Sequence, residues 1–381
     1  MIPREQAGLG QSAIGTWSGG RFLHFGEAIS EERLIDLLTP GAGPSTVMTA
    51  DAYGVGEADE LLGKAISGTP REDYKLIGAI GHDFYNAERD GPRGFPRFTS
   101  PELRRPDAYA DYLEMATTKQ LERLGQDRLD LLLLHNPDRI GYTSEVVWGA
   151  MAGLRDKGLT AMIGVAPGPA NGYTLDLLDC FDRFGDLIDW AMIILNPFEP
   201  WPGSYVLDAA AEKNVKVLTR VVDYGGLFWD ILRPGAELGP TDHRGYRPDG
   251  WIEAGVEKLD RIRPIAERHE LTLMQLACQW NLAHPAVECV APTLVQEIGP
   301  GARPVEEMRQ ELVDLPAEIR LSPEEIEEIA SIGNNHGSMA LKGGSPVFEG
   351  EEKPDGWALS PELDAVAERW GIDPGADLVK A

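Results

Sequence analysis

The stretch Thr49-Ala50-Asp51-Ala52-Tyr53-Gly54, continued by Glu60-Leu61-Leu62-Gly63-Lys64-Ala65, decides how the rest of the sequence is interpreted. Its first residue closes a short apolar run, Thr46–Thr49, which is typical of a buried strand. Its last residues belong to a helix-period segment, Glu57–Ile66. Asp51, Tyr53 and two glycines lie between the two. The stretch therefore predicts a strand, a short loop and a helix, in that order.

The same alternation continues along nearly the whole chain. Strands are predicted at Ser12–Trp17, Thr46–Thr49, Lys75–Gly81, Leu129–His135, Met162–Val165, Trp190–Asn196, Val215–Val222 and Val287–Pro292. Helices are predicted at Ser30–Leu38, Glu57–Ile66, Asp107–Leu124, Ser144–Lys157, Thr174–Phe184, Ser204–Lys213, Trp251–His269 and Pro304–Leu312. Eight such units predict an α/β fold of the (β/α)8 TIM-barrel type. An open doubly wound sheet is disfavoured because no G-x-G-x-x-G follows any strand.

Two long segments and a tail interrupt this regular pattern. The segments, 83–106 after the third strand and 224–250 after the seventh, are expected to roof the active site as long βα loops. The tail predicts a C-terminal extension, 341–381, packed on a barrel that spans residues 1–340.

Composition excludes several classes of partner. The chain has 381 residues, of which 62 are acidic and 35 basic, giving a formal net charge of −27. Binding to nucleic acid or to an anionic membrane needs basic patches, and none of any length is present. The three cysteines are Cys180, Cys278 and Cys289, and none forms a CxxC pair. With no apolar membrane-length run, these features predict a soluble, cytoplasmic protein with a small-molecule substrate; a homo-oligomer stays open.

The opening stretch resembles the aldo-keto reductase signature, D-T-A-x-x-Y-G followed by E-x-x-L-G-x-A. Further motifs of that family follow in order: His135-Asn136-Pro137-Asp138, Leu154-Arg155-Asp156-Lys157-Gly158 with Ile163-Gly164-Val165, Leu276-Ala277-Cys278-Gln279-Trp280, and Gly301-Ala302-Arg303 with Glu306-Glu307-Met308. The match covers roughly residues 7–335. The chain is identified as a divergent member of the superfamily, similar to its aldose dehydrogenase branch. The resemblance implies an oxidoreductase that uses NADP or NAD on a sugar-like or polyol molecule.

In that family a tyrosine gives a proton to a carbonyl while hydride arrives from nicotinamide. A histidine orients the substrate, and a lysine paired with an aspartate lowers the pKa of the tyrosine. The resemblance places the tyrosine at Tyr53 and the histidine at His135, but the aspartate position holds Met48. No lysine falls in the window Gly78–Asp83 where the family has one.

The nicotinamide contacts implied by the resemblance are replaced as well. The family's Ser-Asn pair aligns with Ala166-Pro167, its glutamine falls near Met192, and its stacking aromatic aligns with Arg220. The asparagine that closes the adenosine motif aligns with Glu311. Alanine, proline and methionine side chains cannot bond a carboxamide, so the sequence predicts a nicotinamide subsite that is altered or lost.

The sequence thus predicts a catalytic set of Tyr53, His135 and His82. His82 falls in the lysine's window, where a protonated imidazole would lower the pKa of Tyr53 and a neutral one would accept its proton. Activity would then depend on a group that titrates near ~6.5. Residues predicted to bind substrate share positions near strand ends: Trp17, Asp51, Asn136, Arg220, Asp223 and Tyr224. The adenosine motif supplies the predicted cofactor residues Gly301, Arg303 and Glu307.

Several alternatives remain open at this stage. His82, His135 and an aspartate could hold Zn, Fe or Mn, but the spacing matches no metal motif, so no metal site is predicted. Arg220 could simply pair with Asp223, and Trp17 could be a sugar platform or core packing. The arginines of segment 83–106 could anchor an anionic substrate: Arg93, Arg97, Arg104 and Arg105. The functional alternatives are a non-redox isomerase, lyase or hydrolase that uses Tyr53, His82 and His135, and a non-catalytic regulatory or binding protein.

Overall fold

The computed structural model describes residues 8–41, 43–89, 94–168, 174–247, 249–299, 301–335 and 361–373. Parallel strands follow one another in chain order around a single eight-stranded sheet. They are β1 Ala13–Gly15, β2 Thr46–Met48, β3 Lys75–Ile80, β4 Leu129–His135, β5 Thr160–Ala166, β6 Trp190–Ile194, β7 Lys216–Arg220 and β8 Val287–Ala291. Ser12 bridges Val290 in parallel, which joins the first strand to the last. The predicted (β/α)8 barrel is confirmed.

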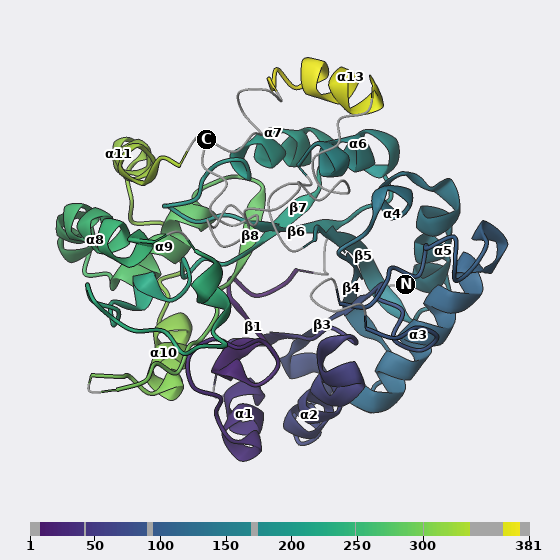
Figure 1. Ribbon diagram of the computed structural model, residues 1–381, viewed down its shortest axis with the longest axis horizontal. Helices are drawn as coiled ribbons and strands as arrows, with labels where there is room; N and C mark the ends of the chain where they lie inside the picture. Colours follow the sequence, from purple (N-terminus) through teal and green to yellow (C-terminus); the bar gives the residue numbers. More distant parts are fainter. Residues whose placement is uncertain are drawn as a thin grey trace.

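Helices surround the strands as an outer ring (Figure 1). They are α1 Glu31–Leu38, α2 Glu57–Ile66, α3 Tyr109–Leu124, α4 Arg139–Thr143, α5 Glu145–Asp156, α6 Thr174–Phe184, α7 Ser204–Lys213, α8 Trp251–Arg268, α9 Leu273–Leu282, α10 Val305–Val313, α11 Pro323–Gly333 and α13 Pro361–Arg369. Side-chain caps fix several starts: Ser30 accepts the Arg33 N–H, and Thr272 forms a capping box with Gln275. Such caps satisfy N–H groups that have no partner inside the helix.

Alternation along each strand separates two apolar layers. In β2, Val47 belongs to the layer between strands and helices, whereas Met48 faces the barrel interior. The interior is filled by small and large side chains from all eight strands, among them Ala79, Leu133 and Met192. The barrel is therefore a packed core, and polar side chains gather only where the strands end.

Both long segments return to the carboxyl ends of the strands. In segment 83–106, Arg97 pairs with His82 as an isolated antiparallel bridge, and the Phe98 N–H donates to the Gly81 carbonyl. Segment 224–250 contains the short 3-10 helices η8, Leu227–Trp229, and η9, His243–Tyr246.

In the predicted C-terminal extension, helix α13 lies against α6. Arg369 of α13 pairs there with Asp182 and with Glu212 of α7. The predicted domain boundary at 340/341 lies outside the described residues and stays a prediction.

Candidate active site

Tyr53 and His135 lie side by side at the carboxyl ends of two strands. Tyr53 follows β2 and begins the 3-10 helix η3, Tyr53–Gly56, while His135 is the last residue of β4. Their ring centroids are 5.8 Å apart, with the rings edge to face at 89°. Both side chains are only partly exposed. The two residues that the family resemblance singled out therefore form one cluster.

His82, which follows β3, packs on the other side of His135, with ring centroids 5.0 Å apart. Its Nδ1 lies 3.2 Å from the Phe95 carbonyl and its Nε2 lies 3.2 Å from Nδ2 of Asn136. A neutral ring satisfies both contacts when Nδ1 carries the hydrogen and Nε2 accepts from the amide. Asn136 is thus a partner of His82, at a backbone φ of 46°.

The prediction that a protonated His82 supplies positive charge to Tyr53 is wrong. Burial, followed by the charge of Arg97, lowers the pKa of His82 to about 3. The Arg97 Nη1 lies 3.1 Å from the His82 Nδ1, so a second positive charge there is unfavourable. Burial also lowers the pKa of His135 well below its ordinary value, with added effects of His82, Arg97 and Arg220. Both imidazoles are therefore neutral at neutral pH.

Arg220 is the cation that acts on Tyr53. It ends β7, and its Nη2 donates to the Pro167 carbonyl oxygen at 3.0 Å. Burial raises the pKa of Tyr53, and the positive charge of Arg220 opposes that rise. A guanidinium stays protonated in proteins, so this charge is permanent. The sequence predicted that His82 would supply this positive charge. Arg220 supplies it instead, from the strand on the opposite side of the barrel.

Asp51 lies outside this cluster, although the sequence predicted it to bind substrate. It is fully buried, and the residues whose charges act on it are Asp59, Arg123 and Asp83. Thr49, two residues earlier, donates a hydrogen bond to Asp59 of α2, so the side chains on this side of the chain face the helices. Within the described part of the chain neither Asp51 oxygen has a well-formed hydrogen bond. Burial, then Asp59, raises the pKa of Asp51 well above its ordinary range, and the nearby Ala52 N–H offsets this only in part.

Trp17 is a packing residue in this structure. It is 7% exposed and belongs to the apolar cluster inside the barrel. A Cβ on Gly15 would come within 2.0 Å of its ring, so the indole lies directly on that glycine. The indole of Trp17 is therefore not an open platform for a sugar ring.

Asp223 and Tyr224 hold the segment after β7 in place. Asp223 accepts the backbone N–H groups of Gly226 and Thr293, which ties this segment to the end of β8. The alternative pairing of Asp223 with Arg220 is not formed. The Tyr224 ring packs edge to face on Phe198, with the Arg247 guanidinium 4.4 Å from its centroid. Both residues, predicted to bind substrate, therefore have structural contacts away from Tyr53.

The arginines of segment 83–106 have separate environments. Arg97 donates to the Asn136 carbonyl beside His82. Arg104 pairs with the buried Asp83 and lies 4.1 Å from the Tyr112 ring centroid. Arg105 is exposed near Asp107, and Arg93 lies outside the described residues. Of the arginines of this segment that the structure describes, only Arg97 reaches the Tyr53–His135 cluster.

The nicotinamide subsite implied by the family does not fit the residues present. Ala166 and Met192 are buried members of the apolar interior and offer a carboxamide no hydrogen bond. Arg220 reaches from β7 to Pro167, after β5, across the position where the resemblance expects an aromatic ring to stack on nicotinamide. No residue is therefore assigned to a nicotinamide at this position.

The adenosine end is occupied by ion pairs within the chain. Arg303, predicted to bind cofactor, pairs with Glu311 at 3.0 Å and with Glu307, another predicted cofactor residue, at 3.6 Å. Gly301, the third, adopts a φ of +96° at a turn. Nearby, Arg244 is 1% exposed and bonds to both Asp242 and Glu297. These four carboxylates outnumber the two arginines that pair with them, so the segment has no surplus positive charge for a phosphate group.

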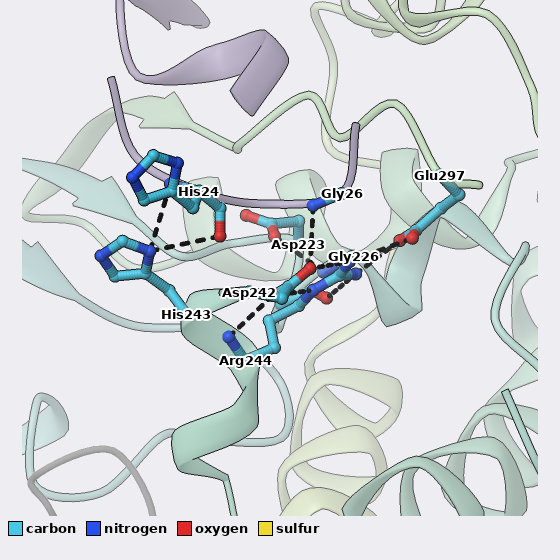
Figure 2. A network of polar contacts seen from close by, with 9 residues as sticks. His24, Gly26, Asp223, Gly226, Asp242, His243, Arg244 and Glu297 are labelled. Carbon is cyan, nitrogen blue, oxygen red and sulfur yellow. Dashed lines mark hydrogen bonds and ion pairs between the residues drawn. The ribbon is translucent and has the colours of Figure 1, made fainter. Parts of the chain in front are cut away.

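Figure 2 shows how this network joins three loops. Asp242 accepts the Gly26 N–H, and the His243 N–H donates to the His24 carbonyl, both from the loop after β1. Arg244 reaches Glu297, from the segment after β8. A cavity of about 310 Å³ beside it is lined by residues 231–239 together with Asp242, Arg244 and Glu297. Sequence reasoning missed this network, because nothing in residue spacing relates Arg244 to Glu297.

Comparison with known proteins places the chain in a family. The model of the aldo/keto reductase family matches residues 13–334. The chain therefore belongs to the aldo/keto reductase family, a family of oxidoreductases.

Individual relatives are distant but cover most of the chain. D-threo-aldose 1-dehydrogenase of a Pseudomonas species is 25% identical over 300 residues, covering 74% of this chain and 85% of that enzyme. The structure of a glycerol dehydrogenase from Gluconobacter oxydans is 20% identical with a TM-score of 0.66, covering 85% of this chain and 91% of its own. An aldo/keto reductase from Klebsiella pneumoniae, solved with NADP, is 20% identical with a TM-score of 0.56, covering 86% and 93%. The two solved structures support the fold.

The described residues contain neither a metal-binding cluster nor a membrane-spanning helix. No group of three or more His, Cys, Asp or Glu side chains in the described ranges is placed to hold a metal ion. Among the helices that the structure describes, none has the length and apolar character to span a membrane.

Proposed function

We propose that this protein is an oxidoreductase that acts on a sugar-like or polyol small molecule, with Tyr53 transferring the proton at the reacting oxygen. The observation that carries this proposal is the Tyr53–His135 cluster at the barrel mouth, with Arg220 supplying positive charge. The names of D-threo-aldose 1-dehydrogenase and of glycerol dehydrogenase, among the related proteins, support this substrate class.

Each residue of the cluster has a distinct role in the proposed proton transfer. In reduction the Tyr53 hydroxyl would donate its proton to a carbonyl oxygen while a bound nicotinamide would supply the hydride. In oxidation its phenolate would accept a hydroxyl proton while the nicotinamide would take the hydride. Arg220 stabilises that phenolate, which burial alone would disfavour. His135 is neutral and can bond the substrate oxygen through a ring nitrogen. His82, packed against His135 and bonded by Asn136, keeps the imidazole in position.

A second candidate is favoured by the misfit of the cofactor subsite. Tyr53 and His135 would then transfer protons without net redox, as in an isomerase, a lyase or a hydrolase. Ala166 and Met192 leave nicotinamide without hydrogen bonds, and Arg220 crosses its expected position. This reading uses the same residues and differs only in whether a dinucleotide is bound.

Titration of NADPH and NADP by calorimetry separates the two candidates. Micromolar binding supports the oxidoreductase, and the absence of binding at millimolar cofactor favours the non-redox enzyme. Turnover is then measured on aldoses, ketoses and polyols, with and without cofactor. If no compound of the panel is turned over, both enzyme candidates are contradicted and a binding protein is favoured.

A further inference from the structure

Arg220 is partly buried and differs in its partners from other buried or partly buried arginines. Arg244 pairs with Asp242 and Glu297, Arg247 with Glu199, Arg123 with Asp59 and Arg104 with Asp83. Among the described residues, the Arg220 guanidinium has one hydrogen bond, to the Pro167 carbonyl, and pairs with no carboxylate. A guanidinium has five N–H donors, so most of its capacity is unused. A buried charge without a counter-charge is costly and is usually balanced by a ligand.

The neighbours of Arg220 leave this charge unbalanced. The phenol of Tyr53 and the imidazole of His135 are both neutral at neutral pH. The charge of Arg220 lowers the pKa of each. Ala166, the last residue of β5, and Met192, in the middle of β6, are apolar. Tyr53, His135 and Arg220 are each partly exposed, so a ligand at the mouth can reach all three. An oxyanion placed here would accept bonds from the guanidinium beside the reacting oxygen.

We propose that Arg220 binds a carboxylate of the substrate, so that the substrate is a sugar acid or another hydroxy acid and not a neutral sugar. The inference rests on the proposed function, since it assumes that the reacting oxygen lies at Tyr53. One guanidinium matches one carboxylate in charge and in its two-pronged geometry. A phosphate carries about −1.5 to −2 charges at neutral pH, more than this single group balances.

Matched pairs of ligands test the inference by calorimetry. Glucuronate is compared with glucose, gluconate with sorbitol and glycerate with glycerol, on the full chain and on Tyr53→Phe to prevent turnover. At least one acid is expected to bind about tenfold or more tightly than its neutral partner. Because arginine does not titrate, the preference should be constant from pH 6 to pH 9.

Variants at Arg220 assign the preference to this residue. Arg220→Gln should weaken acid binding about 10- to 100-fold and leave the neutral partner unchanged, whereas Arg220→Lys should keep part of the preference. Arg233→Gln, at an exposed pair with Asp230, is the control and should change neither. If Arg220→Gln does not fold, the wild-type pairs still decide the outcome.

The results separate this inference from the proposed function. Acid binding without turnover of any acid supports the carboxylate site and rejects the proposed activity. Turnover of neutral sugars, with acids bound no better, keeps the activity and overturns the carboxylate site. Tighter binding of glucose 6-phosphate than of glucuronate would overturn it too, as would a preference that persists in Arg220→Gln or the binding of no acid at 10 mM.

Discussion

The barrel mouth has two halves that differ in how they match the family pattern. The half formed by β2 to β4 keeps a tyrosine and a histidine side by side, supported by His82 and Asn136. The half formed by β5 to β8 has Ala166, Met192 and Arg220 where nicotinamide contacts are expected, with a buried ion network beyond them. The two halves are not independent, because Arg220 of the second half supplies positive charge to Tyr53 of the first.

The first prediction tests the half formed by β2 to β4, which keeps the family's tyrosine and histidine. Tyr53→Phe should lower turnover about 10²- to 10⁴-fold, because it removes the group that exchanges a proton with the reacting oxygen in the proposed oxidoreductase. Tyr74→Phe is the control: it deletes a buried hydroxyl bonded to Gln126, next to the amino end of β3. Steady-state kinetics with substrates found in the panel measure both variants. Equal turnover in Tyr53→Phe and wild type would remove Tyr53 from the mechanism.

The second prediction tests the half formed by β5 to β8, through its buried ion network. Arg244→Leu leaves Asp242 and Glu297 as buried carboxylates without their partner and should cost about 3–5 kcal/mol of unfolding free energy. Arg263→Gln breaks a pair with Asp230 that is about one-third exposed, and should cost no more than about 1 kcal/mol. Urea unfolding at neutral pH compares the two. Similar losses would mean that the Arg244 network is no more than a surface contact.

The third prediction follows from the lowered pKa of His82. The folded-state value is about 3 and the unfolded value is ~6.5, so below pH 6.5 only the unfolded state takes up this proton. Stability should therefore fall as pH drops from about 6.5 toward 3, and His82 adds no pH dependence above that range. His82→Gln should gain about 2 kcal/mol relative to wild type between pH 7 and pH 5.

Urea unfolding at both pH values checks this gain, with His24→Gln at an exposed position as the control. An unchanged difference between pH 7 and pH 5 would show that His82 is protonated in the folded state. Turnover gives a second readout, because neutral imidazoles should leave the rate without a limb near pH 6.5.

The fourth prediction, the smallest, concerns Asp51. Its effect on stability changes with pH in the opposite direction to that of His82. Burial raises the folded-state pKa of Asp51, so above pH ~4 the unfolded state loses a proton that the folded state keeps. Stability is then lost as pH rises, and Asp51→Asn should be more stable than wild type at pH 7 by a margin that shrinks toward pH 4. Asp59→Asn, which loses a pair with Arg123, should instead destabilise. A loss of stability in Asp51→Asn at pH 7 would indicate an ionised, partnered carboxylate.

Local pattern was enough to predict the barrel and part of the site. Apolar runs such as Leu129–His135 and helix-period segments such as Thr174–Phe184 occur with the predicted bounds, because each carries its own periodicity. Strand ends were less certain: β1 is Ala13–Gly15 where Ser12–Trp17 was predicted. The alternation of strands and helices then leaves a closed parallel barrel as the consistent arrangement.

The sequence by itself determined the barrel and the pairing of Tyr53 with His135, because these follow from periodicity and from motifs in register. The loss of the family's lysine stays a prediction from the resemblance. Only the tertiary structure decided the charge of His82, which depends on burial and on Arg97, fifteen positions away in the chain. It also decided that Asp51 faces the helices and that Arg220 faces Tyr53 without a carboxylate partner. These properties depend on which groups from distant strands surround a side chain, and no local pattern contains that information.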